Sequence, residues 1–179
     1  MTVQAQLVKQ AKDGDKEAFA SLYTQLQGEL YRFALYSLGN PADAEDAVAE
    51  AFTQAYRGIG KLREPAAFHS WMFQILSAQC KRRIRGIIRE KGNTSFEEMA
   101  SQLMGDVRFE ELSAERLTLL GALNSLKPQE RMIVLLCVVY GYTERQVAQI
   151  LREPQGTVSS KRYRALKKLR QRIEGRNAQ

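Results

Sequence analysis

The C-terminal part of the sequence concentrates groups that bind the phosphates and bases of nucleic acids. Nine lysine and arginine residues and only two glutamates lie between Arg152 and Arg176. Apolar residues recur there at helical spacing, and polar and basic residues fall beside that apolar stripe. Lysine attracts phosphate, whereas arginine can bind a guanine edge through two hydrogen bonds. The pattern favours a DNA-binding helix over a merely solvated cationic one. The residues beside the stripe are Ser159, Ser160, Tyr163, Arg164 and Lys167.

A shorter helix is predicted immediately before this basic helix. Thr143 and Gln146 have the spacing of a capping box, in which each residue satisfies a backbone donor near the other. Apolar residues from Val147 onward give the short helix a buried face. Pro154 and Gly156 then indicate a tight turn. Two helices joined in this way form a helix-turn-helix, whose second helix lies in the DNA major groove.

A second candidate site is an acidic face on a helix predicted from Pro41 to about Ile59. Asp43, Asp46 and Glu50 recur at helical spacing, with Glu45 beside them. Such carboxylates are compatible with a solvated face, with favourable charge in the first turn, or with docking of a basic protein. A metal site is disfavoured because the only histidine lies outside this helix and no second carboxylate cluster accompanies it. Composition does not distinguish the remaining alternatives.

A third candidate site joins aromatic residues to a cationic tract on a helix predicted from about Ala66. Phe68 and Trp71 lie near its start. For most of the aromatic and apolar residues here, burial in a core is the simpler interpretation. Aromatic rings followed by basic residues are also typical of proteins that bind single-stranded DNA by stacking and backbone attraction. The basic residues are Lys81, Arg82 and Arg83.

Composition and patterning set the fold class and the surroundings. The 179 residues carry a formal net charge of +7, which suits a polyanionic partner. No apolar run reaches the roughly 20 residues of a membrane span, and the N-terminus has no signal-peptide core, so we expect a cytoplasmic protein. Cys80 and Cys137 lie in apolar helical surroundings and are expected to be free thiols. Helical periodicity without strand alternation predicts an all-α fold.

The pattern of breaks predicts two small helical domains joined by a linker. The first domain covers residues 1–90, the linker residues 91–112, and the second domain residues 113–179. Glycine-containing turns within the linker interrupt the helical periodicity. A helix is expected from Ser113 to Leu126, and another from Pro128 to Val139 with an apolar, buried body. The helix-turn-helix completes the second domain.

Three stretches, in order, resemble bacterial RNA polymerase sigma factors of the extracytoplasmic-function (ECF) group of the sigma-70 family. DAEDAVAEAFTQAY (Asp43–Tyr56) is similar to the family's polymerase-binding helix. FHSWMFQILSAQCKRRIR (Phe68–Arg85) is similar to its promoter-melting and −10 helix. The segment from Leu126 to Arg170, which contains GYTERQVAQIL and PQGTVSSKRYRALKKLR, is similar to its −35 domain. The opening GDKEAFASLY (Gly14–Tyr23) also fits.

The resemblance implies a function for each candidate site. It implies that the acidic face, comprising Asp43, Glu45, Asp46 and Glu50, contacts core RNA polymerase. It implies that the loop at Gly60–Ala67 and the helix after it hold the separated −10 strand. The residues assigned to that strand are Phe68, Trp71, Lys81, Arg82 and Arg83. It implies that Ser159, Ser160, Tyr163 and Arg164 face the −35 groove, with Lys161 and Lys167 near phosphates. The expected partners are core RNA polymerase, promoter DNA and an anti-sigma protein, without a cofactor, a metal or a small-molecule substrate.

The chain departs from the family pattern at several positions. Ala78 and Arg82 stand where asparagine and aspartate are frequent, Ala49 where glutamine is frequent, and Arg162 where an apolar residue is usual. Ala78 lacks a side-chain group that could hydrogen-bond a flipped base, so −10 discrimination must depend on other residues. These departures prevent a promoter sequence from being inferred.

Two other functions remain alternatives. A helix-turn-helix regulator acting without core polymerase would account for the C-terminal domain, but would leave the acidic face and the Trp71 region unused. A basic nuclease would require paired carboxylates with a metal, or a histidine base beside a nucleophile. The sequence offers neither constellation, so we expect no enzymatic activity.

Overall fold

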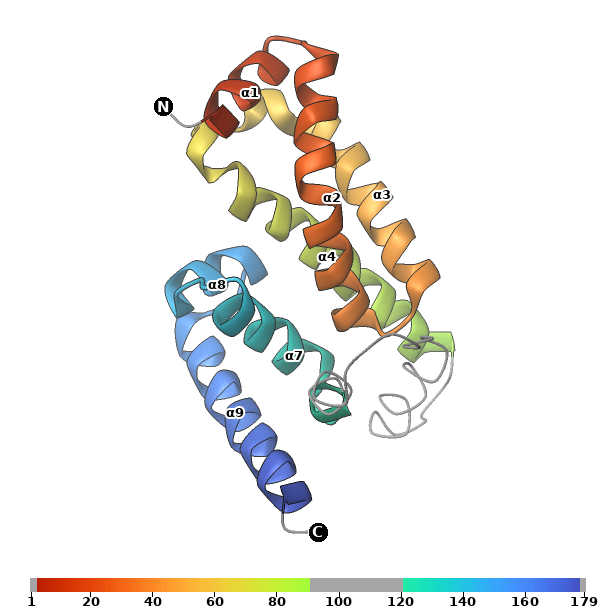
Figure 1. Cartoon of the computed structure of the whole chain (residues 1–179), viewed down its shortest axis with the longest axis vertical. Coiled ribbons are helices and arrows are strands. Elements are labelled where there is room, and N and C mark those ends of the chain that lie inside the picture. Colours follow the sequence, from red (N-terminus) through yellow and green to blue (C-terminus); the bar gives the residue numbers. More distant parts are fainter. Residues whose placement is uncertain (1–2, 91–120, 178–179) are drawn as a thin grey trace.

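The computed structural model describes residues 3–90 and 121–177. These ranges consist of helices and connecting turns, with no β-strand in either range. The all-α prediction is therefore confirmed for the described residues. Figure 1 shows the N-terminal helices grouped in one half of the molecule and the C-terminal helices in the other. The expected helix from Ser113 to Leu126 lies mostly outside the described residues.

The N-terminal half contains four α-helices. Helix α1 (Val3–Lys12) precedes the long α2 (Lys16–Leu38), which packs against both α3 (Pro41–Gly58) and α4 (Phe68–Glu90). Helix α3 also packs directly against α4. Two short 3₁₀ turns at Ile59–Lys61 and Pro65–Ala67 connect α3 to α4. This arrangement places the acidic face of α3 and the basic end of α4 on neighbouring elements.

Local capping explains where α2 begins and ends and where α3 begins. The Asp15 side chain accepts a hydrogen bond from the Ala18 amide at 3.0 Å. The C-terminal cap of α2 is Gly39, whose φ of 73° is a left-handed conformation that glycine adopts without steric cost. Asn40 then caps α3 by accepting from the Asp43 amide at 2.9 Å. All three of these capping signals are present in the sequence.

The buried face of α3 is built largely from alanine. Small side chains allow the backbones of neighbouring helices to approach closely, and the opposite face of α3 remains available for charged residues. The alanines of this face, all completely buried, are Ala44, Ala47, Ala51 and Ala55.

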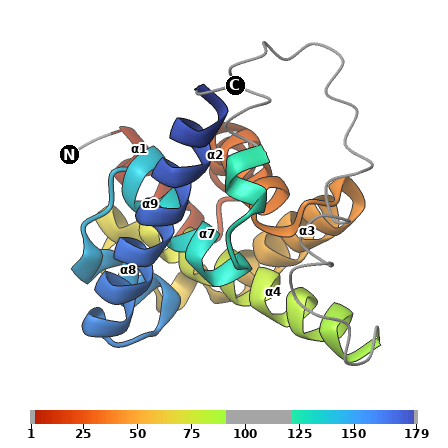
Figure 2. The ribbon, with the colours of Figure 1, turned by 90° about the horizontal axis from the view of Figure 1, so that it is seen from below.

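The C-terminal half contains α7 (Pro128–Val134), the π-helical turn η3 (Leu135–Val139), α8 (Glu144–Leu151) and α9 (Gln155–Asn177). Helix α9 packs on both α7 and α8. Figure 2 shows the two halves from below, with α9 lying over α7 and α8. The predicted helix-turn-helix is thus formed by α8 and α9.

The π turn corrects one sequence expectation. Val138 and Val139 were expected in the buried body of their helix, but they are 58% and 62% exposed. The Tyr140 amide donates to the Leu135 carbonyl at 3.1 Å, five residues back, and this wider turn adds a residue to the helical repeat. Residues after Leu136 are therefore rotated away from the core face that a regular α-helix would have presented.

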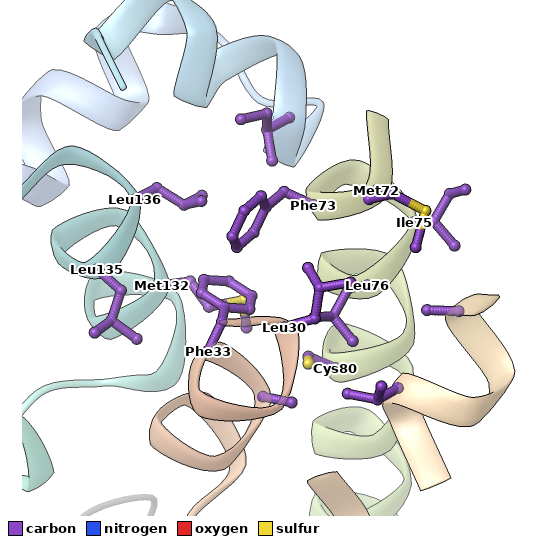
Figure 3. Packing of buried hydrophobic residues seen from close by; sticks show 14 of the residues in the cluster. Leu30, Phe33, Met72, Phe73, Ile75, Leu76, Cys80, Met132, Leu135 and Leu136 are labelled. Atoms are coloured by element: carbon purple, nitrogen blue, oxygen red, sulfur yellow. The ribbon is translucent and has the colours of Figure 1, made fainter. Parts of the chain in front are cut away.

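The two halves share one hydrophobic core. Phe33 of α2 and Phe73 of α4 meet Leu136 and Met132 from the C-terminal half, as Figure 3 shows. Tyr140 extends this contact, with its ring centroid 4.7 Å from that of Phe73. Burial of these aromatic and aliphatic side chains stabilises the packing of the two halves against one another. The halves are therefore packed against one another and not merely tethered.

Candidate functional sites

The acidic face of α3 is partly neutralised by α4. The Arg83 guanidinium lies 3.0 Å from Asp43, 3.4 Å from Asp46 and 3.5 Å from Glu50, measured between the nearest nitrogen and oxygen atoms. Arg82 forms a further ion pair with Glu50. The structure thereby brings together residues that the sequence interpretation assigned to two different partners.

Two of the acidic residues nevertheless remain available to an external partner. The Asp46 side chain is 70% exposed despite its distant contact with Arg83. Glu45, the neighbouring carboxylate, is exposed as well. Because exposed ion pairs are weak, a partner with a denser positive surface could compete for Asp46 at little cost. Asp43 lies deeper and is bound more closely by Arg83.

The aromatic part of the third candidate site needs one correction. Phe68 is completely buried in the core of the N-terminal half, so it has no face on which a base could stack in this conformation. Phe68 is therefore a core residue at the start of α4, and as packed here its ring offers no surface to a single-stranded DNA base. Trp71 is only half-buried and packs next to Gly58, where an added Cβ would come within 3.5 Å of the indole. Trp71 thus keeps some accessible surface.

The basic residues of α4 point in different directions. Lys81 donates hydrogen bonds to the Leu151 carbonyl at 2.7 Å and to the Glu153 carboxylate at 2.9 Å, both in the C-terminal half. Its side chain is only 21% exposed. Arg83 faces α3, and Arg82 is exposed beside it. The cationic tract therefore does not form a single open surface.

The exposed face of α9 carries several of the polar residues that the sequence placed beside the apolar stripe. The Tyr163 side chain is 70% exposed, and Arg164 and Lys167 are exposed on the same helix. Arg164 Nε donates to the Ser160 carbonyl at 3.3 Å, which lays the guanidinium along the helix surface. Meanwhile Val158, Ala165 and Leu169 are buried against the rest of the C-terminal half. The stripe and its polar flank are thus both present.

Two of the residues assigned to the −35 element, Ser159 and Lys161, are bound by carboxylates within the chain. Ser159 Oγ donates to Glu144, which also accepts from Arg162 Nη1 at 2.9 Å. Hydrogen bonds from Ser159 and Arg162 lower the pKa of Glu144 below its ordinary value. Arg162 therefore ties the start of α8 to α9. Lys161 binds Glu153 at 2.8 Å and Gln129 at 2.7 Å.

The capping of α8 fixes the geometry of the helix-turn-helix. Thr143 and Gln146 form the predicted reciprocal capping box, with the Thr143 amide donating to Gln146 Oε1 at 2.9 Å. Arg152 ends α8 in a left-handed conformation with a φ of 52°. That sharp reversal positions Glu153 at the start of the turn leading to α9.

Sequence reasoning missed the contacts that join the two halves. His69 lies between Tyr142 and Glu29, with Nδ1 2.5 Å from the Tyr142 hydroxyl and Nε2 3.0 Å from the Glu29 carboxylate. Arg131 is buried and donates to the Tyr36 carbonyl of α2 at 3.1 Å. Burial lowers the pKa of Arg131 to about 10. A charged residue within the apolar run from Pro128 was the only sequence signal for such a contact.

The residues that the structure describes contain neither a candidate metal-binding group nor a candidate membrane-spanning helix. Within residues 3–90 and 121–177, no group of three histidine, cysteine or acidic side chains is arranged to hold a metal ion. Among the helices in those ranges, none has the length and apolar character needed to cross a membrane.

Comparison with known proteins agrees with this geometry. The family model for sigma-70 region 2 matches residues 22–89, and that for sigma-70 region 4 matches residues 116–169. The first match contains the α3 and α4 sites, and the second contains the helix-turn-helix. Together the two matches cover more than half of the chain, in the order that the sequence predicted.

The individual proteins that the chain resembles are sigma factors as well. The ECF RNA polymerase sigma factor SigW of Bacillus subtilis is 27% identical over 93% of this chain and 94% of its own length. The ECF sigma factor BldN of Streptomyces coelicolor is 28% identical over 92% of this chain, which spans only 63% of that relative. A crystal structure of the sigma factor RpoE from Bartonella quintana, solved with the anti-sigma factor NepR, is 20% identical with a TM-score of 0.67; the match covers 87% of this chain and 96% of that one. Region 2 and region 4, present in order and folded as described, place this chain in the ECF group of the sigma-70 family of RNA polymerase sigma factors.

Proposed function

We propose that this chain binds core RNA polymerase and directs it to promoters through separate −10 and −35 contacts. The observation that carries the proposal is the presence of two differently charged surfaces on the matched regions: exposed carboxylates on α3 and an exposed basic face on α9. The first surface suits a basic protein, and the second suits DNA. Both tasks would be carried out in the cytoplasm, where polymerase and promoter DNA meet.

We assign polymerase binding to the face formed by Asp43, Glu45, Asp46 and Glu50. The exposure of Glu45 and Asp46 supports this assignment, because both can form new ion pairs without unfolding α3. Glu50 and Asp43 would contribute after exchanging their contacts with α4. On this interpretation Arg82 and Arg83 keep the acidic face partly neutralised until core polymerase binds.

We assign the −10 strand to Trp71 and the basic part of α4, with residues 1–90 acting as one domain. A half-buried indole can expose one face to a base, and aromatic–base stacking contributes about 1–3 kcal/mol. Lys81, Arg82 and Arg83 would supply positive charge, although Lys81 and Arg83 are engaged within the chain here. With alanine at position 78, discrimination between bases depends on groups other than that side chain.

We assign the −35 element to α9, within a domain of residues 113–179 that follows the 91–112 linker. Ser159, Ser160, Tyr163 and Arg164 would lie toward the groove, and Lys161 and Lys167 near phosphates. The exposure of Tyr163, Arg164 and Lys167 supports this orientation. Lys161 would have to exchange its carboxylate partner for DNA.

We also propose regulation by an anti-sigma protein. The sigma factor RpoE of Bartonella quintana was crystallised with the anti-sigma factor NepR, and this chain shares the fold of that sigma factor. A partner that covers the α3 or α9 surface would prevent polymerase or promoter binding. The chain itself would contribute recognition and strand capture, while core polymerase performs nucleotide addition.

The decisive experiment combines the purified chain with core RNA polymerase and promoter fragments. A mobility shift should show that the chain co-migrates with core polymerase, and run-off transcription should begin at discrete sites only when both are present. A chain that binds promoter DNA but neither binds core polymerase nor supports transcription would instead be a helix-turn-helix regulator working alone.

A further inference from the structure

Glu144, in the first turn of α8, binds two side chains of α9. One carboxylate oxygen accepts a hydrogen bond from Ser159 Oγ, and the other accepts from Arg162 Nη1 at 2.9 Å. The Glu144 side chain is half-buried. The same three residues line a surface depression together with Tyr163 and Lys167. Glu144 therefore lies on the side of the helix-turn-helix that we assign to DNA.

Charge fixes the direction of the hydrogen bond between Ser159 and Glu144. Hydrogen bonds from Ser159 and Arg162 lower the pKa of Glu144, so its carboxylate is ionised at neutral pH. An ionised carboxylate accepts hydrogen bonds and donates none. Because a serine hydroxyl has a single hydrogen, Ser159 donates that hydrogen to Glu144 and keeps only the lone pairs of its oxygen. In this arrangement Ser159 can accept one more hydrogen bond but cannot donate one.

We propose that Glu144 makes Ser159 a hydrogen-bond acceptor toward the −35 element and thereby selects an amino-bearing base, adenine or cytosine, on the strand that Ser159 faces. This role rests on the proposed contact between α9 and the −35 groove. In the major groove adenine presents its N6 amino group and cytosine its N4 amino group, whereas guanine and thymine present a keto oxygen there. A Ser159 oxygen without a hydrogen to donate can bind only the amino groups. Glu144 is thus a positioning residue that acts through Ser159.

The bond from Ser159 to Glu144 can persist when α9 binds DNA. A hydrogen bond to an ionised acceptor is about twice as strong as one to a neutral acceptor, so the keto oxygen of a base competes poorly with the carboxylate. Arg162 offsets the charge of Glu144 and so reduces its repulsion of nearby phosphates. Ser160 differs, because its hydroxyl donates to the neutral Thr157 carbonyl of its own helix at 3.1 Å. The two adjacent serines therefore offer a base different groups.

The first test finds the base pair that Ser159 contacts. Holoenzyme reconstituted from core polymerase and the full-length chain is bound to promoters carrying every single-base change in the −35 element. At one position, wild-type holoenzyme should prefer an amino base on one strand to a keto base about five- to tenfold, the effect of one hydrogen bond. Ser159→Ala should abolish that preference, and the neighbouring Ser160→Ala should keep it. A Ser159-dependent preference for purines over pyrimidines, or no Ser159-dependent position at all, would overturn the proposal.

Base analogues then identify the group on the DNA. In promoters with adenine at the Ser159 position, the adenine is replaced by purine, which lacks the N6 amino group, or by 7-deazaadenine, which lacks the N7 acceptor. Wild-type holoenzyme should bind the purine promoter about five- to tenfold more weakly and tolerate 7-deazaadenine. Ser159→Ala holoenzyme should be insensitive to both changes. Sensitivity of the wild type to 7-deazaadenine alone would show that Ser159 donates its hydrogen, contrary to the proposal.

The third test removes the anion that orients Ser159. Glu144→Ala frees the hydroxyl to donate or accept, so the amino preference should fall below about twofold, mainly because promoters with keto bases are bound more tightly. Glu144→Gln should keep part of the preference, since its amide oxygen can still accept from Ser159. Holoenzyme binding to the same promoter set measures both effects. Full retention of the amino preference by Glu144→Ala would reject the role of Glu144.

Arg162→Gln is the control for loosening of the contact between α8 and α9. It removes the other partner of Glu144 but leaves the carboxylate to accept from Ser159. This variant should keep the amino preference and weaken binding to all −35 sequences about equally, because it removes a positive charge. Thermal unfolding of each variant verifies that the chain remains folded. Loss of the preference in Arg162→Gln as well as in Glu144→Ala would make Glu144 a purely structural link.

Failure of this inference is distinguishable from failure of the proposed function. If wild-type holoenzyme shows no preference at any −35 position, the assignment of α9 fails, and the role of Glu144 falls with it. If wild-type holoenzyme discriminates between −35 bases and neither Ser159→Ala nor Glu144→Ala alters that discrimination, only the role of Glu144 and Ser159 is rejected.

Discussion

The guanidinium of Arg83 lies 3.0 Å from the carboxylate of Asp43 and joins α4 to α3. This ion pair is flanked by longer contacts from Arg83 to Asp46 and Glu50. One arginine therefore organises three of the four carboxylates assigned to core polymerase. The acidic face is presented on a fixed scaffold, and a polymerase surface would compete with Arg83 mainly at its exposed edge.

That edge provides the first prediction. Asp46→Lys should weaken holoenzyme formation by about tenfold or more, since like charges would then face one another across the interface. Because Asp46 is 70% exposed, the thermal unfolding midpoint should change little. Competition for core polymerase against the wild-type chain measures the effect. Glu17→Lys, an exposed charge reversal at the start of α2, serves as the control.

Two results would contradict a specific contact between Asp46 and core polymerase. If Asp46→Lys and Glu17→Lys compete for core polymerase as well as wild type, the exposed edge of α3 is not part of the interface. Loss of affinity in both variants would indicate a general charge effect and not a specific contact.

Trp71 provides the second prediction. Trp71→Ala should reduce promoter opening because the half-buried indole loses the face available for stacking on a base. The same change removes a packing partner of Gly58 and Phe68, so the free energy of unfolding must be measured in parallel. Trp71→Phe should retain most of the stability and part of the opening. Permanganate reactivity of the melted promoter reports opening; full reactivity with a stably folded Trp71→Ala chain would make Trp71 a packing residue only.

The third prediction separates two exposed cations on α9. Arg164→Ala should cost about 1–3 kcal/mol on the preferred −35 element and relax discrimination at one base pair. Lys167→Ala should weaken binding to all sequences about equally and reduce the salt slope by about one unit. Binding of holoenzyme to single-base −35 variants at several salt concentrations distinguishes them. Equal loss of discrimination in both variants, or discrimination carried by Lys167, would mean that α9 enters the groove in another rotation.

The fourth prediction concerns the two cysteines. Burial raises the pKa of Cys80 to about 12, whereas Cys137 is half-buried and its pKa is raised as well, chiefly by burial. Since the thiolate is the reactive form, a raised pKa reduces reactivity at any pH below it. At pH 8 a disulfide-exchange reagent should label Cys137 slowly and leave Cys80 unlabelled until denaturant is added. Equal labelling rates in the native chain would show that the core around Cys80 opens readily.

The parts of the fold that depend on local chemistry were predictable from the sequence. Asp15, Asn40 and the Thr143–Gln146 pair cap helices through backbone groups three residues away, so their signals are contained in a short window. The stripe and polar flank of α9 follow from helical periodicity in the same way. The order of the two matched regions was also visible, because each contains its own motif.

The remaining features depend on contacts that no local pattern contains. Lys81 and Glu153 are 72 residues apart, and their pairing follows from how α4 and α8 pack. The sequence is compatible with Phe68 either in an aromatic DNA site or in the hydrophobic core, and only the packed structure shows that its side chain is buried. Val138 and Val139 were misplaced because the π turn at Leu135–Val139 changes the helical repeat within an apolar run. Such a run has no polar residues to indicate which face is buried.

One measurement tests the central assignment most directly. Core RNA polymerase is reconstituted with the purified chain, genomic fragments are transcribed, and start sites are mapped against a reaction containing core polymerase alone. A sigma factor should produce a restricted set of discrete starts, each preceded by shared elements near −10 and −35 and each dependent on the added chain. Starts that are identical with and without the chain would contradict the assignment.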